Sequence, residues 1–122
     1  GTGLLDERFF IYTEEIDLCR RLQDQGWHLY WIPGAAIVHH GGASTSQVGR
    51  PMFVELYRSK VQYFRKHFGL RGVIGYKAVL AAAALTRVGL ASVAMAVQPA
   101  QRAKWRALLT DYSVLLARLN TL

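Results

Sequence analysis

The residues of this chain best suited to chemistry lie within its first 45 positions. Three carboxylates, Glu14, Glu15 and Asp17, fall within four residues of one another. A carboxylate held beside a reacting hydroxyl can accept its proton, which is the task of a general base. Acidic residues in a first helical turn more commonly only complement the helix dipole, so the cluster alone leaves catalysis and a solvated surface both open.

A histidine pair and a small-residue loop follow the carboxylates. His39 and His40 end a run of β-forming residues, and a neutral imidazole is a common metal ligand. The loop begins directly afterwards with Gly41 and Gly42. Histidines after a strand are often structural, and glycine pairs often only turn the chain. The order of the three features is therefore more informative than any one of them.

A short helix is expected to present the carboxylates. Thr13 is a suitable N-cap, and Gly26 is an expected C-terminal stop. Ile16, Cys19 and Leu22 recur at a helical spacing, which predicts the buried stripe of this helix.

Extended structure is expected after that helix. Residues 27–32 and 35–39 are rich in aromatic and branched side chains on either side of a Pro33-Gly34 turn. This pattern predicts two short extended segments, followed by a flexible loop over residues 40–49.

The second half predicts helices. Pro51 suits a first helical turn, and aromatic residues recurring every three or four positions predict a basic amphipathic helix that ends at Gly69. A final helix is expected after Pro99 and as far as about Leu119.

The apolar stretch between them, residues 73–97, is long enough to cross a bilayer, at about 37 Å as a helix. Lys77 and Arg87 interrupt it, and a central Arg costs about 2.5 to 3.5 kcal/mol to insert. We therefore expect a helix that lies at the interface or packs on the domain, with a single crossing as the alternative.

Charge divides the chain into two halves. Residues 1–49 contain three basic and six acidic residues, whereas residues 50–122 contain twelve basic and two acidic ones. This split predicts chemistry in the first half and docking, onto an anionic membrane surface rather than nucleic acid, in the second.

A single cysteine excludes an internal disulfide framework and a cysteine-built zinc site, and 52% hydrophobic residues exclude disorder.

The amino-acid sequence of the first 44 residues resembles the C-terminal part of family 2 glycosyltransferases, notably rhamnosyltransferase-like members. The resemblance covers residues 3–44 well and continues loosely to Gly69. The matching segments are Leu5-Asp6-Glu7-Arg8-Phe9-Phe10-Ile11-Tyr12-Thr13-Glu14-Glu15-Ile16-Asp17-Leu18-Cys19-Arg20-Arg21-Leu22, Gly26-Trp27, Pro33 and His39-His40-Gly41-Gly42-Ala43-Ser44.

This resemblance implies an α/β fold. Residues 1–49 would be the C-terminal part of a GT-A type, Rossmann-like catalytic domain, and residues 50–122 a membrane-associated tail of amphipathic and apolar α-helices. The implied activity is inverting transfer of a sugar from a nucleotide-diphosphate sugar to a hydroxyl acceptor. The acceptor would be a lipid-linked glycan of bacterial cell-surface polysaccharide synthesis, on the cytoplasmic side of the cell membrane.

The resemblance also implies roles by position. Glu15 would be the base, although it stands where the family usually has Asp, and Glu14 would orient neighbouring groups. His39 would help to bind a divalent cation, Mg²⁺ or Mn²⁺, that neutralises the diphosphate leaving group. The substrate-binding candidates, of which the first two are also expected to support the helix and loop, are Asp17, Arg21, Gly41, Gly42 and Ser44.

Two hypotheses follow. The Asp-x-Asp metal motif that the family places before this segment is absent from the 122 residues, so we expect a fragment that lacks the donor-binding half and is inactive alone. The same absence, together with Glu15 in place of Asp, leaves as the alternative a non-catalytic helical module that binds a membrane or a partner.

Overall fold

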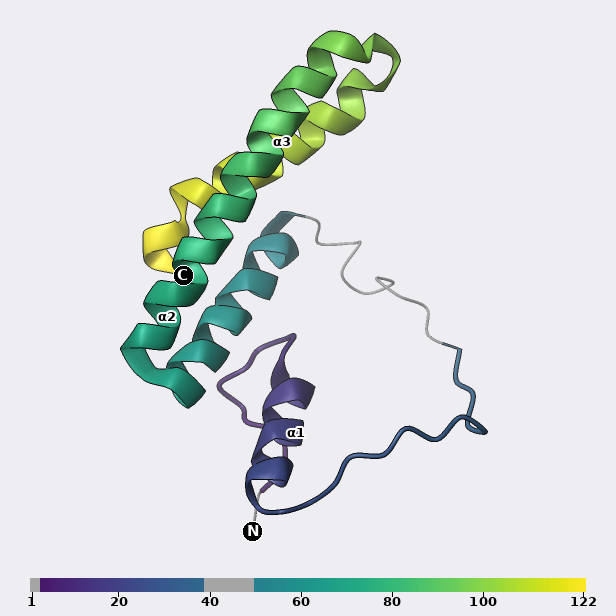
Figure 1. The fold of residues 1–122 in the computed structure, drawn as a ribbon, viewed down its shortest axis with the longest axis vertical. Helices are drawn as coiled ribbons and strands as arrows, with labels where there is room; N and C mark the ends of the chain where they lie inside the picture. Colours follow the sequence, from purple (N-terminus) through teal and green to yellow (C-terminus); the bar gives the residue numbers. More distant parts are fainter. Residues whose placement is uncertain (1–2, 39–49) are drawn as a thin grey trace. The chain divides into compact units, whose positions relative to one another are not determined.

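The computed structural model describes residues 3–38 and 50–122. It contains α-helices and short 3-10 helices (Figure 1), which are α1 (Glu14–Asp24), α2 (Arg50–Val97), η1 (Pro99–Gln101), α3 (Arg102–Ala117) and η2 (Leu119–Thr121). The chain divides into two compact units, Gly1–Tyr63 and Phe64–Leu122. The functional division after residue 49 stays a prediction.

The predicted α/β, Rossmann-like fold is wrong for the residues that the structure describes, since they form helices and no strand. Residues 27–38 have the side chains expected of strands, yet they pair with no other described segment and are exposed throughout. A strand needs a neighbour to complete its hydrogen bonds, and β propensity largely reflects packing on a sheet. Without such a neighbour, only the Pro33-Gly34 turn forms, closed by the Ala35 N–H on the Ile32 carbonyl at 3.2 Å.

Helix α1 ends as predicted. Gly26 has φ 84°, its N–H donates to Gln23, and the N–H of Trp27 donates to Leu22, which together form a Schellman motif. The predicted buried stripe is wrong at Ile16, which is 49% exposed, and its other members, Cys19 and Leu22, are only half-buried. The side chain that α1 buries completely is its neighbour, Asp17.

Helix α2 begins and breaks where the sequence predicted. Pro51 lies in its first turn, and Gly69, with φ 62° and ψ −158°, interrupts the helical conformation. Positive φ is strained for any residue with a Cβ, so a glycine is the natural residue at this kink. The segment before the kink buries Val54 and Val61 in the Gly1–Tyr63 unit.

After the kink, α2 and α3 form an antiparallel hairpin within the Phe64–Leu122 unit (Figure 1). The Arg87 guanidinium lies over the Tyr112 ring, 5.3 Å from its centroid, and the Trp105 indole N–H donates to Gln98 at 3.2 Å. The buried residues of this unit are apolar: Val73, Leu80, Ala84, Ala91, Leu115 and Leu122. On α2 they recur at intervals of seven, four and seven residues, which defines one helix face.

The two charges that interrupt the apolar stretch fall on the side of α2 that carries this face. Lys77 lies four residues after Val73, and Arg87 lies three residues after Ala84, so both are helical neighbours of buried residues. Among the described residues, one helix, Pro51–Val97, is long and apolar enough to cross a membrane by length and composition, with a mean hydropathy of 1.8 over an 18-residue stretch.

Candidate functional site

The backbone turns sharply just before the carboxylates of α1. Tyr12 and Thr13 both have left-handed conformations, with φ 66° and 71°. For residues other than glycine, such conformations cost about 1 to 3 kcal/mol each and concentrate at functional sites. Thr13 precedes the helix as predicted, but its side chain caps no described N–H; instead its carbonyl accepts the Asp17 N–H at 2.8 Å.

Glu14 and Glu15, the predicted catalytic pair, occupy the first two positions of α1 and differ in exposure. The Glu15 side chain is exposed, whereas Glu14 is half-buried. One carboxylate oxygen of Glu14, Oε2, is buried and has no hydrogen-bond partner among the described residues. Buried polar atoms nearly always have partners, so this oxygen is an acceptor that a bound hydroxyl or amide would satisfy.

Asp17 and Arg21 hold α1 to the start of the described chain. The Asp17 side chain is fully buried, and Arg21 Nε donates to its Oδ2 at 2.8 Å. The Nη2 group of the same guanidinium donates to the Leu4 carbonyl at 2.7 Å. The structure therefore brings these two predicted residues together, in a contact that fixes the helix; substrate binding by either stays a prediction.

Two residues of α2 hold the loop that leads into α1. The Ser59 hydroxyl donates to the Ile11 carbonyl at 2.6 Å, and Gln62 Nε2 donates to the Arg8 carbonyl at 2.8 Å. Ser59 is only 1% exposed. Sequence reasoning missed both positioning residues, because their partners are main-chain carbonyls about 50 positions away and no local pattern marks them.

The predicted loop residues His39, Gly41, Gly42 and Ser44 lie outside the described residues. Within 3–38 and 50–122, no three histidine, cysteine or acidic side chains converge in a way that could hold a metal ion. The described residues thus do not make up a metal site by themselves, and the divalent cation stays a prediction.

Comparison with known proteins gives a short match. The chain is 42% identical over 45 residues, 37% of its length, to N-acetylglucosaminyl-diphospho-decaprenol L-rhamnosyltransferase from two strains of Mycobacterium tuberculosis. It spans 15% of the length of these curated relatives. No protein-family profile and no solved structure matches the chain. Part of the chain is therefore similar to a glycosyltransferase.

Proposed function

We propose that this chain is a catalytic segment of an inverting glycosyltransferase of bacterial cell-surface polysaccharide synthesis. The observation that carries the proposal is the adjacent carboxylate pair, Glu14 and Glu15, at a strained helix start that is tied down from two sides. Similarity to a rhamnosyltransferase supports a sugar as the transferred group. The name of that relative also suggests the acceptor class, a glycan on a polyprenyl diphosphate.

Glu15 is the proposed base. Its exposed carboxylate accepts the proton of the acceptor hydroxyl while that oxygen bonds to the anomeric carbon and the bond from this carbon to the nucleotide diphosphate breaks. Attack opposite to the leaving group inverts the configuration. The buried Glu14 oxygen would accept a hydrogen bond from another hydroxyl of the acceptor and so orient it. A divalent cation held with His39, still a prediction, would supply positive charge to the leaving diphosphate.

Conservative substitutions at Glu15 test this role in the protein made from its complete reading frame. Glu15→Gln keeps the shape of the side chain and removes the base, so kcat should fall about 10² to 10⁴-fold. Glu15→Asp, which restores the residue usual in the family, should retain measurable transfer. The assay follows sugar transfer from a nucleotide-diphosphate sugar to a lipid-linked acceptor.

Glu7→Gln is the matched control, because Glu7 is another exposed carboxylate of the same unit and should not affect transfer. Full activity of the Glu15→Gln enzyme would remove Glu15 as base. Complete inactivity of the unmodified protein with nucleotide sugars would instead favour the non-catalytic helical module.

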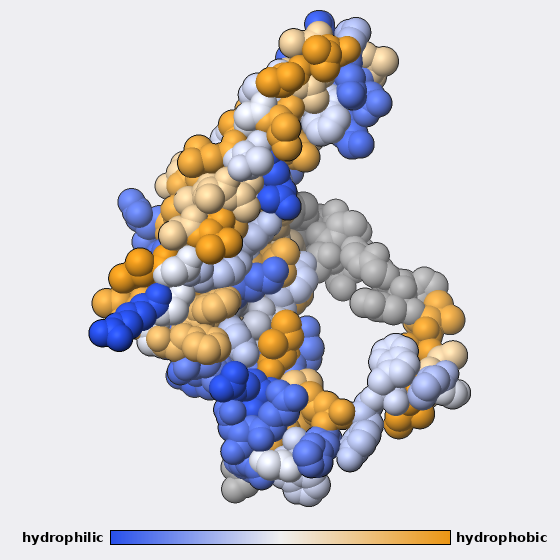
Figure 2. Space-filling view, in the orientation of Figure 1, coloured by the Kyte–Doolittle hydropathy of each residue, from blue (hydrophilic) through white to orange (hydrophobic). Residues whose placement is uncertain are grey.

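We also propose that the α2–α3 hairpin attaches the protein to the cytoplasmic face of the membrane. Between residues 72 and 97, Arg87 is the one exposed charged residue, and it lies over Tyr112. Large apolar side chains cover the opposite, exposed face of α2 (orange in the upper arm of Figure 2), among them Ile74, Val79, Leu85, Leu90, Val93 and Val97.

The hydroxyls on this face already have acceptors. Thr86 donates to the Ala82 carbonyl at 2.9 Å and Ser92 to the Val88 carbonyl at 2.8 Å. A surface whose Thr and Ser hydroxyls already have acceptors suits contact with hydrocarbon, where each unpaired polar group would cost several kcal/mol. Basic residues on α3 can meet lipid phosphates at the rim.

Vesicle binding tests the attachment. Val93→Lys puts a charge in the centre of the apolar face and should weaken sedimentation with anionic phospholipid vesicles at least about tenfold, since burial of one Val contributes about 1.5 kcal/mol or more. Ser113→Lys adds the same charge to an exposed position of α3 and should bind at least as well as the unmodified chain. Equal binding of the two variants would exclude the apolar face as the contact.

A further inference from the structure

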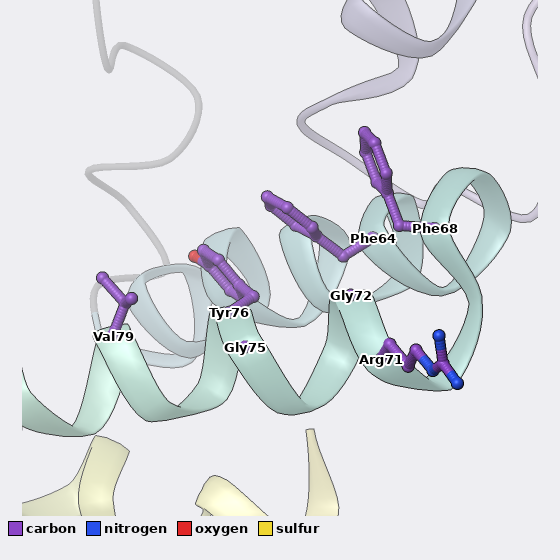
Figure 3. A pocket seen from close by; sticks show the side chains of 7 residues that line it. All are labelled: Phe64, Phe68, Arg71, Gly72, Gly75, Tyr76 and Val79. Atoms are coloured by element: carbon purple, nitrogen blue, oxygen red, sulfur yellow. The ribbon is translucent and has the colours of Figure 1, made fainter.

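A groove of about 550 Å³ lies beside the kink of α2, within the Phe64–Leu122 unit (Figure 3). This volume lies within the range of ordinary small-molecule sites. Phe64, Phe68, Tyr76 and Val79 project to the same side of the two helical segments, and together they form its apolar wall.

Glycines at a spacing of three create the groove. Gly69 allows the kink with its positive φ. Gly72 allows the close return of the helix, because a Cβ there would clash with the Cβ of Phe68. A Cβ at Gly75 would meet no other atom within 4 Å, so the missing side chain of this glycine leaves the floor of the groove open.

The wall is aromatic and uncharged. The Phe64 and Tyr76 rings stack with centroids 4.6 Å apart and planes 13° apart, and the Phe64 ring centroid lies 5.4 Å from that of Phe68. Burial raises the pKa of the Tyr76 phenol to about 12, because desolvation disfavours the phenolate. The wall therefore stays neutral at physiological pH.

One end of the groove is basic. Arg71, which is exposed, lines the groove at the kink, and its guanidinium points away from the rings (Figure 3). Residues 56–110 contain ten Lys and Arg and no Asp or Glu, so no carboxylate of this stretch offsets that charge. An apolar trough with a guanidinium at one end matches a ligand with a hydrocarbon chain and an anionic group.

We infer that this groove binds the hydrocarbon chain of a single anionic lipid, with the lipid phosphate paired to Arg71. Flat rings and a bare helix backbone contact a chain along its length, and a guanidinium can donate two hydrogen bonds to one phosphate. Val79 belongs both to the groove and to the exposed apolar face of α2, so a chain can leave the groove along the surface proposed to face the membrane.

This inference deepens the proposed membrane attachment and also stands apart from it, because monomeric lipids test the groove without a bilayer. Two classes of lipid combine a hydrocarbon chain with a phosphate: polyprenyl phosphates and phospholipids. The probes are farnesyl phosphate, farnesol and dihexanoyl phosphatidylglycerol, each titrated calorimetrically into the chain below the concentration at which it forms micelles.

Gly75→Leu fills the groove and should weaken binding of every probe at least about tenfold. Gly89→Leu is the matched control, because Gly89 is also an exposed glycine of α2 with open space around it. Leu has a higher helix propensity than Gly, so both variants should fold, with a melting temperature no lower than that of the unmodified chain. Binding by the Gly89→Leu chain should stay within about twofold.

Arg71→Gln tests the contact with the phosphate alone. It should weaken the binding of farnesyl phosphate about tenfold and leave the binding of farnesol unchanged. Whichever of farnesyl phosphate and dihexanoyl phosphatidylglycerol binds more tightly identifies the class of lipid that the groove takes. Undiminished binding by the Gly75→Leu chain would overturn the groove as the site, and equal affinity of the unmodified chain for farnesol and farnesyl phosphate would overturn the role of Arg71. Either result would leave the vesicle experiment with Val93→Lys unaffected.

Discussion

The Gly1–Tyr63 unit and the Phe64–Leu122 unit bury different kinds of side chain. Among the described residues, the buried polar side chains, Thr13, Asp17 and Ser59, all belong to the first unit. The buried side chains of the second unit are all apolar, and two of them, Ala84 and Ala91, are small enough for close helix packing. Directional contacts thus add to apolar packing in the first unit, where Phe9, Val54 and Val61 are also buried, whereas the buried residues of the second unit are apolar throughout.

The difference suits two tasks. Hydrogen bonds at 2.6 to 2.8 Å, such as those of Ser59 and Arg21, fix a loop at defined points, and a shift near 1 Å in a catalytic group can cost about 100-fold in rate. Packing of Ala and Leu along a hairpin tolerates sliding but leaves the outer face free for contact. The proposed catalytic carboxylates, Glu14 and Glu15, lie in the first unit, and the exposed apolar face of α2 lies in the second.

The largest expected effect comes from removing the partner of a buried charge. Arg21→Gln leaves the Asp17 carboxylate buried without its guanidinium and should lower the free energy of unfolding by about 3 kcal/mol. Arg20→Gln is the control on the same helix, because Arg20 pairs with the exposed Asp24 and should cost less than about 1 kcal/mol. Urea denaturation measures both; similar losses would mean that the Asp17 pair does not hold the first unit.

Local signals predicted the helical framework. Gly26, Pro51 and Gly69 act through their own backbone conformations, so the sequence places the end of α1, the start of α2 and its kink. The position of Glu14 and Glu15 at a helix start was predictable for the same reason, since acidic residues suit that end of the dipole.

The features that the sequence did not predict depend on contacts between residues far apart in the chain. Residues 27–38 have strand-forming side chains, but no propensity supplies the second strand that a ladder needs. Ile16 occupies a position expected to be buried, whereas Asp17 is buried instead because Arg21 neutralises it. Ser59 and Gln62 hold the carboxylate loop through carbonyls far away in sequence, and periodicity carries no information about such pairs.

An intermediate effect is expected from enlarging a packed residue of the hairpin. Ala84→Leu inserts three carbons at a fully buried position and should cost about 1 to 3 kcal/mol. Ala82→Leu adds the same volume on the exposed face, so it should leave the free energy of unfolding within about 0.5 kcal/mol and strengthen vesicle binding. Thermal unfolding of both variants checks the pair, and a neutral Ala84→Leu would show that α2 and α3 do not pack closely.

The smallest expected effect separates the two ways in which serines of α2 use their hydroxyls. Ser59→Ala removes the hydrogen bond to the Ile11 carbonyl and should cost about 1 kcal/mol. Ser92→Ala removes a hydrogen bond back to Val88 within the same helix and should be neutral or slightly stabilising, because such bonds compete with the helix ladder. The sharper readout is kinetic: Ser59→Ala should lower kcat for sugar transfer while Ser92→Ala leaves it unchanged, since Ser59 alone of the two holds the loop before Glu14. Equal kcat values for the two variants would show that the position of that loop does not affect the rate of transfer.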